Sequence, residues 1–483
     1  MLRLDSTYAR ELRGFSTPWK PAAVPNARPL FFNRPLAEAL GLDAEALAGA
    51  EGTAVFAGNA VPEGAEPVAQ AYAGHQFGGF SPQLGDGRAV LLGEWVDPAG
   101  RRVDIALKGS GRTPFSRGGD GKAAVGPMLR EALIGEAMHA LGIPTTRALA
   151  VVATGEPVLR ETVLPGAVLT RVAASHIRVG TFQFFAARGD LARVQQLADH
   201  AIARHDPDLV GGDPGRYAAF LGRIAERQAA LIAQWMNVGF IHGVMNTDNM
   251  AVSGETIDYG PCAFLEAYDP EAVFSSIDSG GRYAYGNQPA IARWNVTRLA
   301  ECLLPLLGDG DDAQQAAAMD VIDGFPARFA LHWRAGQRRK LGLPPGAAVE
   351  ALADDWLALL DAAGADFTLA WRRLADAAEG DEAPLRALLP DASTLDPWLV
   401  RWRANLSADA VARLRRVNPW LVPRHPQVEA ALAAASQDEA DIAPFDALLS
   451  ALRQPFDERP EHARFAEPAS AAATARYRTF CGT

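Results

Sequence analysis

Strand-like and helix-like segments are separated along this chain, and their order constrains the fold more than any other sequence feature. Short apolar runs with turn residues between them fill residues 85–174, whereas amphipathic helical patterns dominate from residue 175 onward. One helical segment, 127–141, interrupts the strand-rich part; it starts at Pro127, a favourable first-turn residue, and stops before Gly142. The sequence therefore predicts an α+β protein whose antiparallel sheet carries one inserted helix.

The individual elements follow from hydrophobic periodicity. The predicted strands are 88–96, 102–108, 148–153, 157–161 and 167–173. Apolar residues at helical spacing predict helices at 191–205 and 217–240, and the second of these leads directly into the motif discussed below. From about residue 310 to 455, Ala, Leu, Trp and Arg recur at helical spacing without a fixed-length repeat, which predicts further helices.

These patterns divide the 483 residues into three parts. We expect residues 1–174 to hold an N-terminal segment and the sheet, residues 175–310 to form a helical part, and residues 311–483 to form a helical extension. The tail after Ala451 carries mixed charge and three prolines, and we expect it to lie over the surface.

Composition narrows the functional class. Hydrophobic residues make up 49% of the chain, charged residues 21%, and the mean hydropathy is -0.03, values typical of a soluble globular protein. No run of 18 apolar residues occurs, so no membrane-spanning helix is expected, and the net charge of -11 argues against a nucleic-acid partner. The N-terminus places Asp5 and Glu11 among arginines and lacks a secretory signal, so we expect a cytoplasmic protein.

The stretch HGVMNTDNMAVSGETIDYGP, residues 242–261, contains groups that phosphoryl chemistry requires. Asn249 and Asp258 offer the hard oxygen ligands that Mg²⁺ prefers, and Gly260 leaves the backbone after the second acid free to turn. The Asp-Tyr-Gly triplet alone is equally typical of an ordinary turn. We expect the neighbouring Tyr259 to be a core residue.

A lysine and a glutamate upstream complete a recognisable set. Lys108 ends a predicted strand on the face opposite Ile105 and Leu107, and Glu131 shares a helical stripe with apolar residues such as Met128. A carboxylate in apolar surroundings needs a cation. A strand lysine, a helix glutamate and a later Asn and Asp-x-Gly pair are the parts of a protein-kinase-like nucleotide site.

Four longer segments make the likeness specific. They are AYAGHQFGGFSPQLGDGRAVLLGE, DIALKGSGRTPFSRGGDGKAAVGPMLREALIGEAMHALGIPTTRAL, LTRVAASHIRVGTFQFFA and HGVMNTDNMAVSGETIDYGPCAF, and they cover residues 70 to 270 densely, with NPWLVPR extending the likeness towards the C-terminus. On these segments the chain resembles the SelO (YdiU, selenoprotein O) family of pseudokinase-fold protein nucleotidyltransferases. The resemblance implies a two-lobed, protein-kinase-like fold with an antiparallel-sheet N-lobe and a mainly helical C-lobe.

The same resemblance implies the reaction. Counted against the kinase pattern H-R-D-x-x-x-x-N, His242 and Asn249 fall in register, but the catalytic-acid position is Val244. In the family, the aspartate that matches Asp248 is proposed as the proton acceptor. ATP is expected to bind inverted relative to a kinase, so that AMP and not phosphate is transferred to Ser, Thr or Tyr hydroxyls of target proteins.

Roles for the other residues also come from the match. Lys108 is expected to contact phosphate and pair with Glu131, while Asn249 and Asp258 are expected to hold Mg²⁺ or Mn²⁺. Further nucleotide-contacting residues implied by the resemblance are Gly85, Gly87, Arg88, Asp120, Gly121, Arg171, Arg178 and Asp258 itself. Planar guanidinium groups suit phosphate oxygens and can replace a glycine-loop cradle.

Without the match, these residues have plainer interpretations. Lys108 would be a solvated strand lysine, Gly85 and Gly87 a hairpin turn, and Arg171 and Arg178 surface ion pairs. A P-loop around Lys122 is excluded, because Ser116 stands where a glycine is required and Ala123 replaces the Ser or Thr. We expect His75 and His242 to be packing or hydrogen-bonded residues, since no second histidine lies at metal-ligand spacing.

Alternatives for the function remain at this level. UMP transfer from UTP with Mn²⁺ is a close variant that the family suggests. An ordinary kinase is disfavoured by Val244, and an inactive nucleotide-binding scaffold is disfavoured because Lys108, Glu131, Asp248 and Asn249 are all retained together with Asp258. A monomer is expected. By analogy with the family, the expected partners are proteins that bear hydroxyl side chains, redox-linked proteins among them.

The three cysteines, Cys262, Cys302 and Cys481, contain no CxxC pair, so a zinc site or a disulfide framework is not predicted. Three inert thiols are the plain interpretation. The resemblance, however, implies a disulfide between Cys481 near the C-terminus and Cys262 beside the metal loop, and such a bond would make activity depend on redox state.

Overall fold

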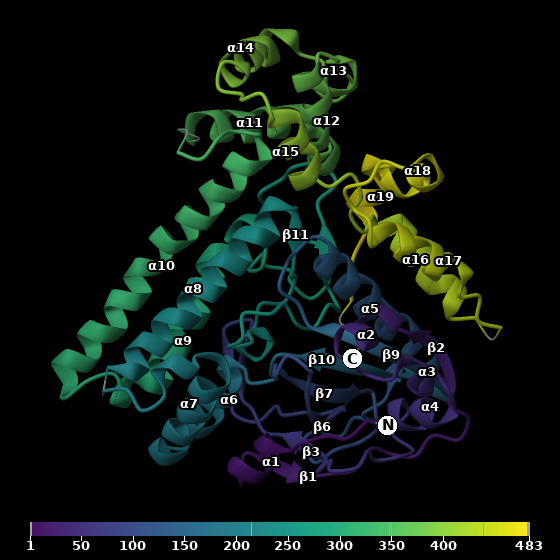
Figure 1. The fold of residues 1–483 in the computed structure, drawn as a ribbon, viewed down its shortest axis with the longest axis vertical. Helices are drawn as coiled ribbons and strands as arrows, with labels where there is room; N and C mark the ends of the chain where they lie inside the picture. The colour runs from purple at the N-terminus through teal and green to yellow at the C-terminus, as the bar shows by residue number, and fades with distance from the viewer. Residues whose placement is uncertain (1, 214, 347, 349, 438, 481–483) are drawn as a thin grey trace.

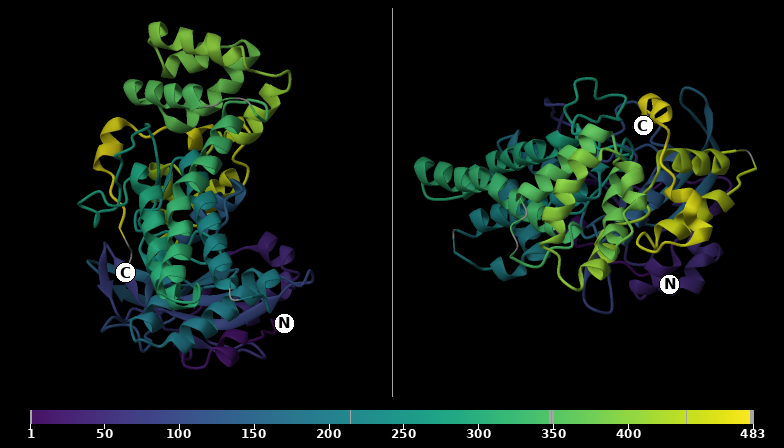
Figure 2. Two further views of the ribbon diagram at one scale, coloured as in Figure 1. Left: turned by 90° about the vertical axis from the view of Figure 1, so that its left-hand side faces the viewer. Right: turned by 90° about the horizontal axis from the view of Figure 1, so that it is seen from above.

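An eight-stranded antiparallel sheet lies at one end of the molecule, and helices occupy the other end (Figures 1 and 2). The computed structural model describes residues 2–480 except 214, 347, 349 and 438. The strand order is β1-β3-β6-β7-β10-β9-β2, with β8 paired to β10. The strands are β1 Ser16–Pro18, β2 Arg28–Phe32, β3 Val68–Gln70, β6 Ala89–Val96, β7 Arg102–Lys108, β8 Ala123–Ala124, β9 Arg147–Leu159 and β10 Val163–Ala173.

The predicted antiparallel sheet is confirmed, with one error in its strands. The predicted strands 148–153 and 157–161 are a single strand, β9, so the prediction of two strands is wrong. Gly155 takes φ +74°, and the register of β9 against β10 shifts between Pro165 and Ala167. Residues 154–156, which the prediction leaves between two strands, are therefore accommodated as an irregularity within a continuous strand pair.

The inserted helix α5, Val125–Ala140, begins two residues before the predicted start. Pro127 thus lies within the first turn, where a missing N–H leaves no hydrogen bond unmade. The predicted helix 191–205 is α7, Leu191–His205, and the predicted helix 217–240 is α8, Arg216–Asn237. α8 ends early because Gly239, at φ +75°, turns the chain out of the helix.

Helices make up most of the chain after β10, as predicted (Figure 1). Two short strand pairs lie outside the main sheet. β4 Gly74–Gln76 pairs with β5 Gly79–Ser81 before the helical part, and β11 Phe240–Ile241 pairs with β12 Ala263–Phe264 within it. The remaining helices are α1 Thr7–Glu11, α2 Arg34–Ala39, α3 Ala44–Ala48, α4 Ala50–Phe56, α6 Val179–Ala186, α9 Gln288–Leu303, α10 Asp311–Lys340, α11 Glu350–Ala363, α12 Phe367–Glu379, α13 Ala383–Leu388, α14 Ala392–Arg403, α15 Ala410–Val417, α16 His425–Ala435, α17 Ala443–Leu452, α18 Ala463–Ala466 and α19 Ala471–Arg476.

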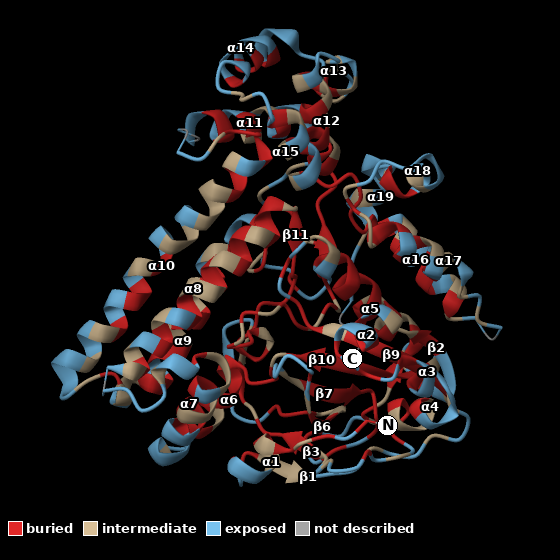
Figure 3. Cartoon of the chain, viewed as in Figure 1, coloured by how far each residue is buried: buried red, intermediate tan, exposed pale blue. Residues whose placement is uncertain are grey.

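Both faces of the sheet are covered, so its central strands are buried (Figure 3). Helices α2 to α4 pack on one face, where Phe56 meets Ile105 and Leu107 in one apolar cluster. Helix α5 lies on the other face, and α16 and α17 cover its outer side with residues such as Leu432 and Phe445. Burial from both sides stabilises α5 in a fixed position against the sheet.

Arg424, a buried residue immediately before α16, forms ion pairs with two acidic residues of the helical part. Arg424 is 1% exposed and donates to Asp366 at 2.7 and 2.9 Å and to Glu266 at 2.6 Å. Burial acts to raise the pKa of Glu266, but His425, at 3.3 Å, and the charge of Arg424 outweigh burial and lower that pKa. The triad joins three segments that are far apart in sequence.

None of the helices in the described part of the chain combines the length and the apolar character needed to cross a bilayer. Helix α10, the longest, has charged residues throughout and exposes much of its length (Figure 3).

We expect Arg424→Met to lower the free energy of unfolding by about 3–5 kcal/mol, because it leaves two buried carboxylates without their cation. Chemical denaturation followed by circular dichroism measures the change. The matched control is Arg415→Met, which removes an exposed pair with Glu379 and should cost about 1 kcal/mol or less. Equal effects of the two substitutions would contradict the role assigned to the triad.

Candidate active site

A cavity of about 760 Å³ opens between the sheet and the loops that follow α8. All twelve residues named as site candidates from the sequence line it, although they come from segments up to 173 positions apart: Gly85, Gly87, Arg88, Lys108, Asp120, Gly121, Glu131, Arg171, Arg178, Asp248, Asn249 and Asp258. Lysine and arginine side chains recur around the wall, namely Arg88, Lys108, Arg117, Lys122, Arg160, Arg171 and Arg178. Such a cavity suits a ligand with several negative charges.

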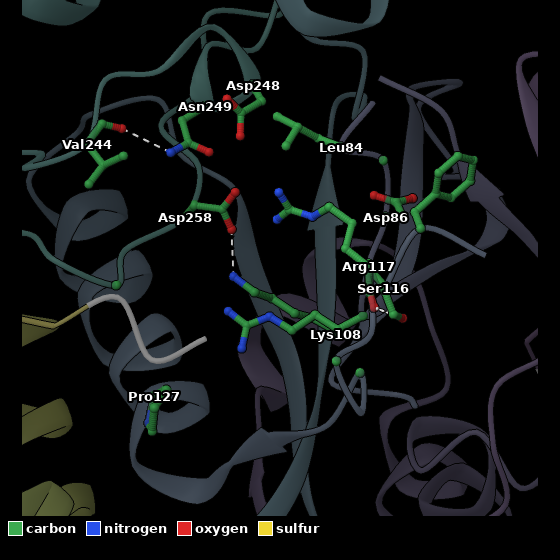
Figure 4. A pocket seen from close by; sticks show the side chains of 18 of the residues that line it. Leu84, Asp86, Lys108, Ser116, Arg117, Pro127, Val244, Asp248, Asn249 and Asp258 are labelled. Atoms are coloured by element: carbon green, nitrogen blue, oxygen red, sulfur yellow. Dashed lines mark hydrogen bonds and ion pairs between the residues drawn. The ribbon is translucent and has the colours of Figure 1, made fainter. Parts of the chain in front are cut away.

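Three buried charged side chains and the partly exposed Asp258 form a network at the floor of the cavity. Lys108, from the end of β7, pairs with Glu131 of α5 and with Asp258, the latter at 2.6 Å (Figure 4). Arg171, from β10, donates to Glu131 at 2.7 Å and to Asp258 at 2.6 Å. Each carboxylate is thus held by both cations. Lys108 and Arg171 are 9% and 4% exposed, so the interpretations as a solvated lysine and a surface ion pair are wrong.

The network controls the ionisation of its two acids. Burial acts to raise the pKa of Asp258, but Arg171, Lys108 and Arg178 outweigh burial and hold that pKa well below the usual range. Burial is likewise outweighed at Glu131 by Arg171 and Lys108, so the pKa of Glu131 is also lowered. Both acids are therefore ionised at neutral pH.

Asp248 lies beside Asn249 in the cavity wall, and its pKa is shifted in the opposite direction (Figure 4). Its side chain is buried, and its Oδ1 atom has no hydrogen-bond partner among the described residues. Burial is the main cause that raises the pKa of Asp248 to about 6, and the charge of Asp258 adds to it, while Arg178 and a 3.4 Å hydrogen bond from Gln76 oppose it. A carboxylate with this pKa is able to accept a proton near neutral pH.

Two glycines allow the backbone to approach this aspartate. A Cβ atom on Gly74 would lie 2.5 Å from Oδ1 of Asp248, and one on Gly180 would lie 2.2 Å from the carbonyl oxygen of Ala73. Any side chain at Gly74 would displace the carboxylate. The close packing explains both the burial of Asp248 and its fixed position.

Arg178 connects the two acids. Its guanidinium donates to the main-chain oxygen of Asp248 at 3.1 Å, lies 3.9 Å from Oδ2 of Asp258, and stacks over the Tyr72 ring at 4.5 Å from the centroid. Arg178 is 5% exposed, so it is not a surface ion pair. It faces the cavity from the N-terminal end of α6.

Asn249 and Asp258 can hold a divalent cation. The Asn249 amide nitrogen donates to the Val244 carbonyl at 3.0 Å, which leaves the amide oxygen on the side of Asp258 (Figure 4). Asp258 itself takes φ +65°, so the turn of this loop is made at the acid. Among the described residues no group of three His, Cys, Asp or Glu side chains is placed around a metal site. Two protein ligands with phosphate oxygens completing the shell are typical of Mg²⁺.

The glycine-containing loops shape the outer wall. Gly85 takes φ +72°, and a Cβ there would lie 2.3 Å from the Phe115 ring, so no other residue fits without displacing that ring. Gly87 packs on the carbonyl oxygen of Phe115, where a Cβ would be at 3.1 Å. The loop is therefore more than a plain hairpin turn, because it packs against a second loop. Arg88 follows it and faces the cavity.

The second loop carries Asp120 and Gly121. Asp120 accepts two hydrogen bonds from Arg160, at 2.9 and 3.1 Å, and one from the Lys122 amide at 2.9 Å. Gly121 takes φ +68°, and a Cβ there would lie 2.2 Å from the Gly111 carbonyl oxygen. Asp120 lines the cavity but is already paired with Arg160.

Several cavity residues were missed by sequence reasoning. Gln76, Phe77 and Asn246 line the cavity beside Asp248, and Arg117 reaches it from the loop after β7. Each lies inside one of the segments that carry the family resemblance, but none belongs to a motif whose spacing alone predicts a role.

The secondary expectations are largely met. Tyr259 is a core residue, 1% exposed, and His242 is buried with Nε2 at 2.8 Å from the Ile257 carbonyl. His75 bonds to Gln183 at 2.7 Å.

Of the predicted cysteine pair, only Cys262 can be described, because Cys481 lies outside the described residues. Cys262 is fully buried, and burial raises the pKa of its thiol to about 12. Thr479 donates from its hydroxyl to the Pro261 carbonyl at 2.7 Å, which brings the end of the described chain beside Cys262.

Sequence comparison shows which known proteins this chain is similar to. The sequence model of the family described as "Protein adenylyltransferase SelO" matches residues 2–453. A "Protein nucleotidyltransferase YdiU" from Cereibacter sphaeroides is 61% identical over 485 residues, covering 100% of this chain and 99% of the relative. Proteins of the same name from Chromobacterium violaceum and a Mycobacterium species are 60% and 57% identical and cover 96% and 100% of this chain, in each case with 99% of the relative.

The raised pKa of Asp248 predicts that this residue destabilises the folded protein. The folded-state value of about 6 exceeds the ordinary 3.8, so stability falls as pH rises through this interval and stays lower above it. We expect Asp248→Asn to increase the free energy of unfolding by about 3 kcal/mol at pH 8, and by less than about 1 kcal/mol near pH 4. Thermal unfolding at the two pH values measures the difference.

The control for that experiment is Asp354→Asn on the exposed surface of α11, which should show no such pH-dependent gain. A gain at Asp248 that was equal at both pH values, or absent at pH 8, would show that ionisation of this carboxylate carries no cost in the folded protein.

Proposed function

Because the chain belongs to the SelO family of protein adenylyltransferases, we propose that it transfers AMP from ATP to Ser, Thr or Tyr hydroxyl groups of other proteins. The observation that carries the proposal is that one cation-rich cavity is lined by a buried carboxylate, Asp248, which accepts a 3.4 Å hydrogen bond from Gln76 on Oδ2 and has no partner for Oδ1 among the described residues. The cations suit a triphosphate, and the carboxylate suits a hydroxyl group that must lose its proton.

In the proposed reaction, Asp248 accepts the proton of the acceptor hydroxyl. The acceptor oxygen then forms a bond to the α-phosphorus of ATP, the bond between that phosphorus and the oxygen bridging to the β-phosphorus breaks, and pyrophosphate leaves with the electron pair. A kinase would place its acid at position 244, where a valine side chain cannot accept a proton. The pKa of about 6 supports Asp248 as base, because it is mostly ionised at pH 7 and still able to bind a proton.

The buried network binds and orients the nucleotide in this proposal. Lys108 and Arg171 already neutralise Glu131 and Asp258, so their remaining donor groups and Arg178 face the phosphates. Asn249 and Asp258 would hold Mg²⁺ or Mn²⁺. When bound, the cation offsets negative charge that develops on the phosphate oxygens.

We also infer a protein-kinase-like arrangement of two lobes. The sheet with α5 would form the N-lobe, and α6 to α9 with the loops after α8 would form the C-lobe. The Lys108–Glu131 pair between a strand and the inserted helix supports this inference, as does the position of the cavity between the sheet and residues 244–261.

Labelled nucleotide distinguishes nucleotidyl transfer from phosphoryl transfer. With Mg²⁺ and ATP labelled on either the α or the γ phosphate, we expect acid-stable α label on protein and no γ label. Asp258→Ala should reduce α labelling at least a hundredfold, because it removes a metal ligand and leaves Lys108 and Arg171 with an unbalanced charge.

The matched control, Asp354→Ala on α11, should label like the unmodified protein, and circular dichroism should show that both variants are folded. Bound γ label would identify a kinase that works without an acid at position 244. Nucleotide binding without transfer of either label would identify an inactive nucleotide-binding scaffold.

The pH dependence of α labelling tests the base. We expect the rate to fall below about pH 6, since protonated Asp248 cannot accept a proton. Gln76→Leu removes a hydrogen bond that lowers the pKa of Asp248, so the acidic limb should move to higher pH. Gln315→Leu, at an exposed position of α10, is the control and should leave the limb in place. If the pH at which the labelling rate falls were the same in Gln76→Leu and in the unmodified protein, Asp248 would not be the base.

A further inference from the structure

The hairpin formed by β4 and β5 lies along the loop that carries Asp248. The His75 amide donates to the Thr247 hydroxyl at 2.7 Å, and the Gln76 side chain reaches Oδ2 of Asp248 at 3.4 Å. The Phe77 amide donates to Oδ1 of Asn246 at 3.2 Å. The hairpin is therefore a fixed wall of the cavity, and it is the wall nearest the proposed base.

Phe77 at the tip of this hairpin is held in an unfavourable backbone conformation. Its φ is +52°, a region that residues with a side chain rarely adopt. The amide of Phe77 also donates to the Tyr283 hydroxyl at 3.1 Å, and that hydroxyl donates to Asn246 at 2.6 Å, so the surroundings maintain the conformation. The result is an aromatic side chain that is 38% exposed at the mouth of the cavity. Strain of this kind is concentrated at functional sites.

Further aromatic rings continue from Phe77 across the surface. The Phe77 and Tyr283 rings lie 5.1 Å apart, and across the hairpin the rings of His75 in β4 and Phe80 in β5 lie 4.8 Å apart. His75 in turn meets Trp294 of α9 edge-on at 5.2 Å. Phe80 is 42% exposed, and Trp294 is partly exposed. Partly exposed aromatic rings in fixed positions can bind an apolar side chain at low entropic cost.

One cation on this surface has no carboxylate partner. The Arg282 guanidinium lies 4.8 Å from the Trp294 ring centroid and 5.8 Å from that of Tyr283, and across the described residues no Asp or Glu lies within ion-pair distance of it. Its neighbour over the same indole ring, Arg298, is paired with Glu301 at 2.6 Å. Arg282 is therefore free to pair with an acidic group from outside, within a protein of net charge -11.

We propose that this hairpin surface, defined as Phe77, Phe80, Arg282 and Trp294, binds the acceptor segment of the protein substrate. The segment that fits carries an apolar or aromatic residue and an acidic residue near the hydroxyl that receives AMP. Gln76 and Phe77 line the cavity beside Asp248, so a segment seated on the hairpin presents its hydroxyl to that carboxylate. The proposal rests on the proposed nucleotidyl transfer and adds what selects the acceptor.

A peptide panel tests the proposal. Synthetic peptides with a central Ser, Thr or Tyr and one varied flanking position are incubated with the full-length protein, Mg²⁺ and α-labelled ATP. We expect wild-type protein to label peptides with Phe or Leu and with Asp or Glu at flanking positions at least tenfold better than peptides with Ala there. Phe80→Ala should abolish the preference for Phe or Leu, and Arg282→Glu should reverse the preference from acidic to basic peptides.

Controls separate this surface from the nucleotide site. The Kd for ATP should change less than twofold in Phe80→Ala and Arg282→Glu, because neither residue lines the cavity. Leu331→Ala and Arg416→Glu, at exposed positions of α10 and α15, should keep the wild-type preferences. A reversal of charge preference cannot arise from loss of folding, so this readout stays informative even if a variant is less stable.

Three outcomes overturn the proposal. If wild-type protein transfers α label and the variants keep its flanking preferences, the acceptor binds elsewhere and only this inference fails. If wild-type protein transfers no α label to any peptide or protein, the proposed function fails and this inference fails with it. If sedimentation shows a dimer that Phe80→Ala and Arg282→Glu convert to a monomer while the preferences are unchanged, the hairpin surface binds a second copy of the chain.

Discussion

The network of Lys108, Glu131, Arg171 and Asp258 is the interaction on which the rest of the site depends. Two cations and two carboxylates from β7, α5, β10 and the loop after α8 pair with one another, and only Asp258 among these four is partly exposed. Removal of any one of them would therefore leave a buried charge with one partner fewer. The network fixes α5 against the sheet and the sheet against the helical part. It thereby sets the width of the cavity in which a triphosphate would lie.

The same arrangement produces opposite behaviour in two acids ten positions apart. Asp258 lies among three cations and is ionised, whereas Asp248 lines the cavity with its Oδ1 atom buried and without a hydrogen-bond partner among the described residues, and it keeps a pKa of about 6. Both residues are aspartates, so the difference in their pKa values comes from their different positions relative to the cations. An aspartate held in this way is costly to the fold, which is typical of a group maintained for chemistry.

Much of this could be predicted from sequence, but only where long patterns existed. The antiparallel sheet, the inserted helix and the helical remainder follow from periodicity, and the segments shared with a known family bring all twelve candidate residues to one cavity. Periodicity could not distinguish the irregularity at Gly155 from a turn, because both need the same residue types. Nor could it find Phe77, whose importance lies in a backbone angle set by contacts with Asn246 and Tyr283.

The packing of α16 and α17 on α5 has a consequence for how the protein is made. The helix that carries Glu131 is covered by residues such as Leu432 and Phe445, which are synthesised about 300 positions later. While the ribosome is still translating the middle of the chain, the outer face of α5 is exposed and the site is incomplete. Nascent or prematurely terminated chains would thus lack a supported nucleotide site, so that modification of other proteins begins only after synthesis has reached the last third of the chain.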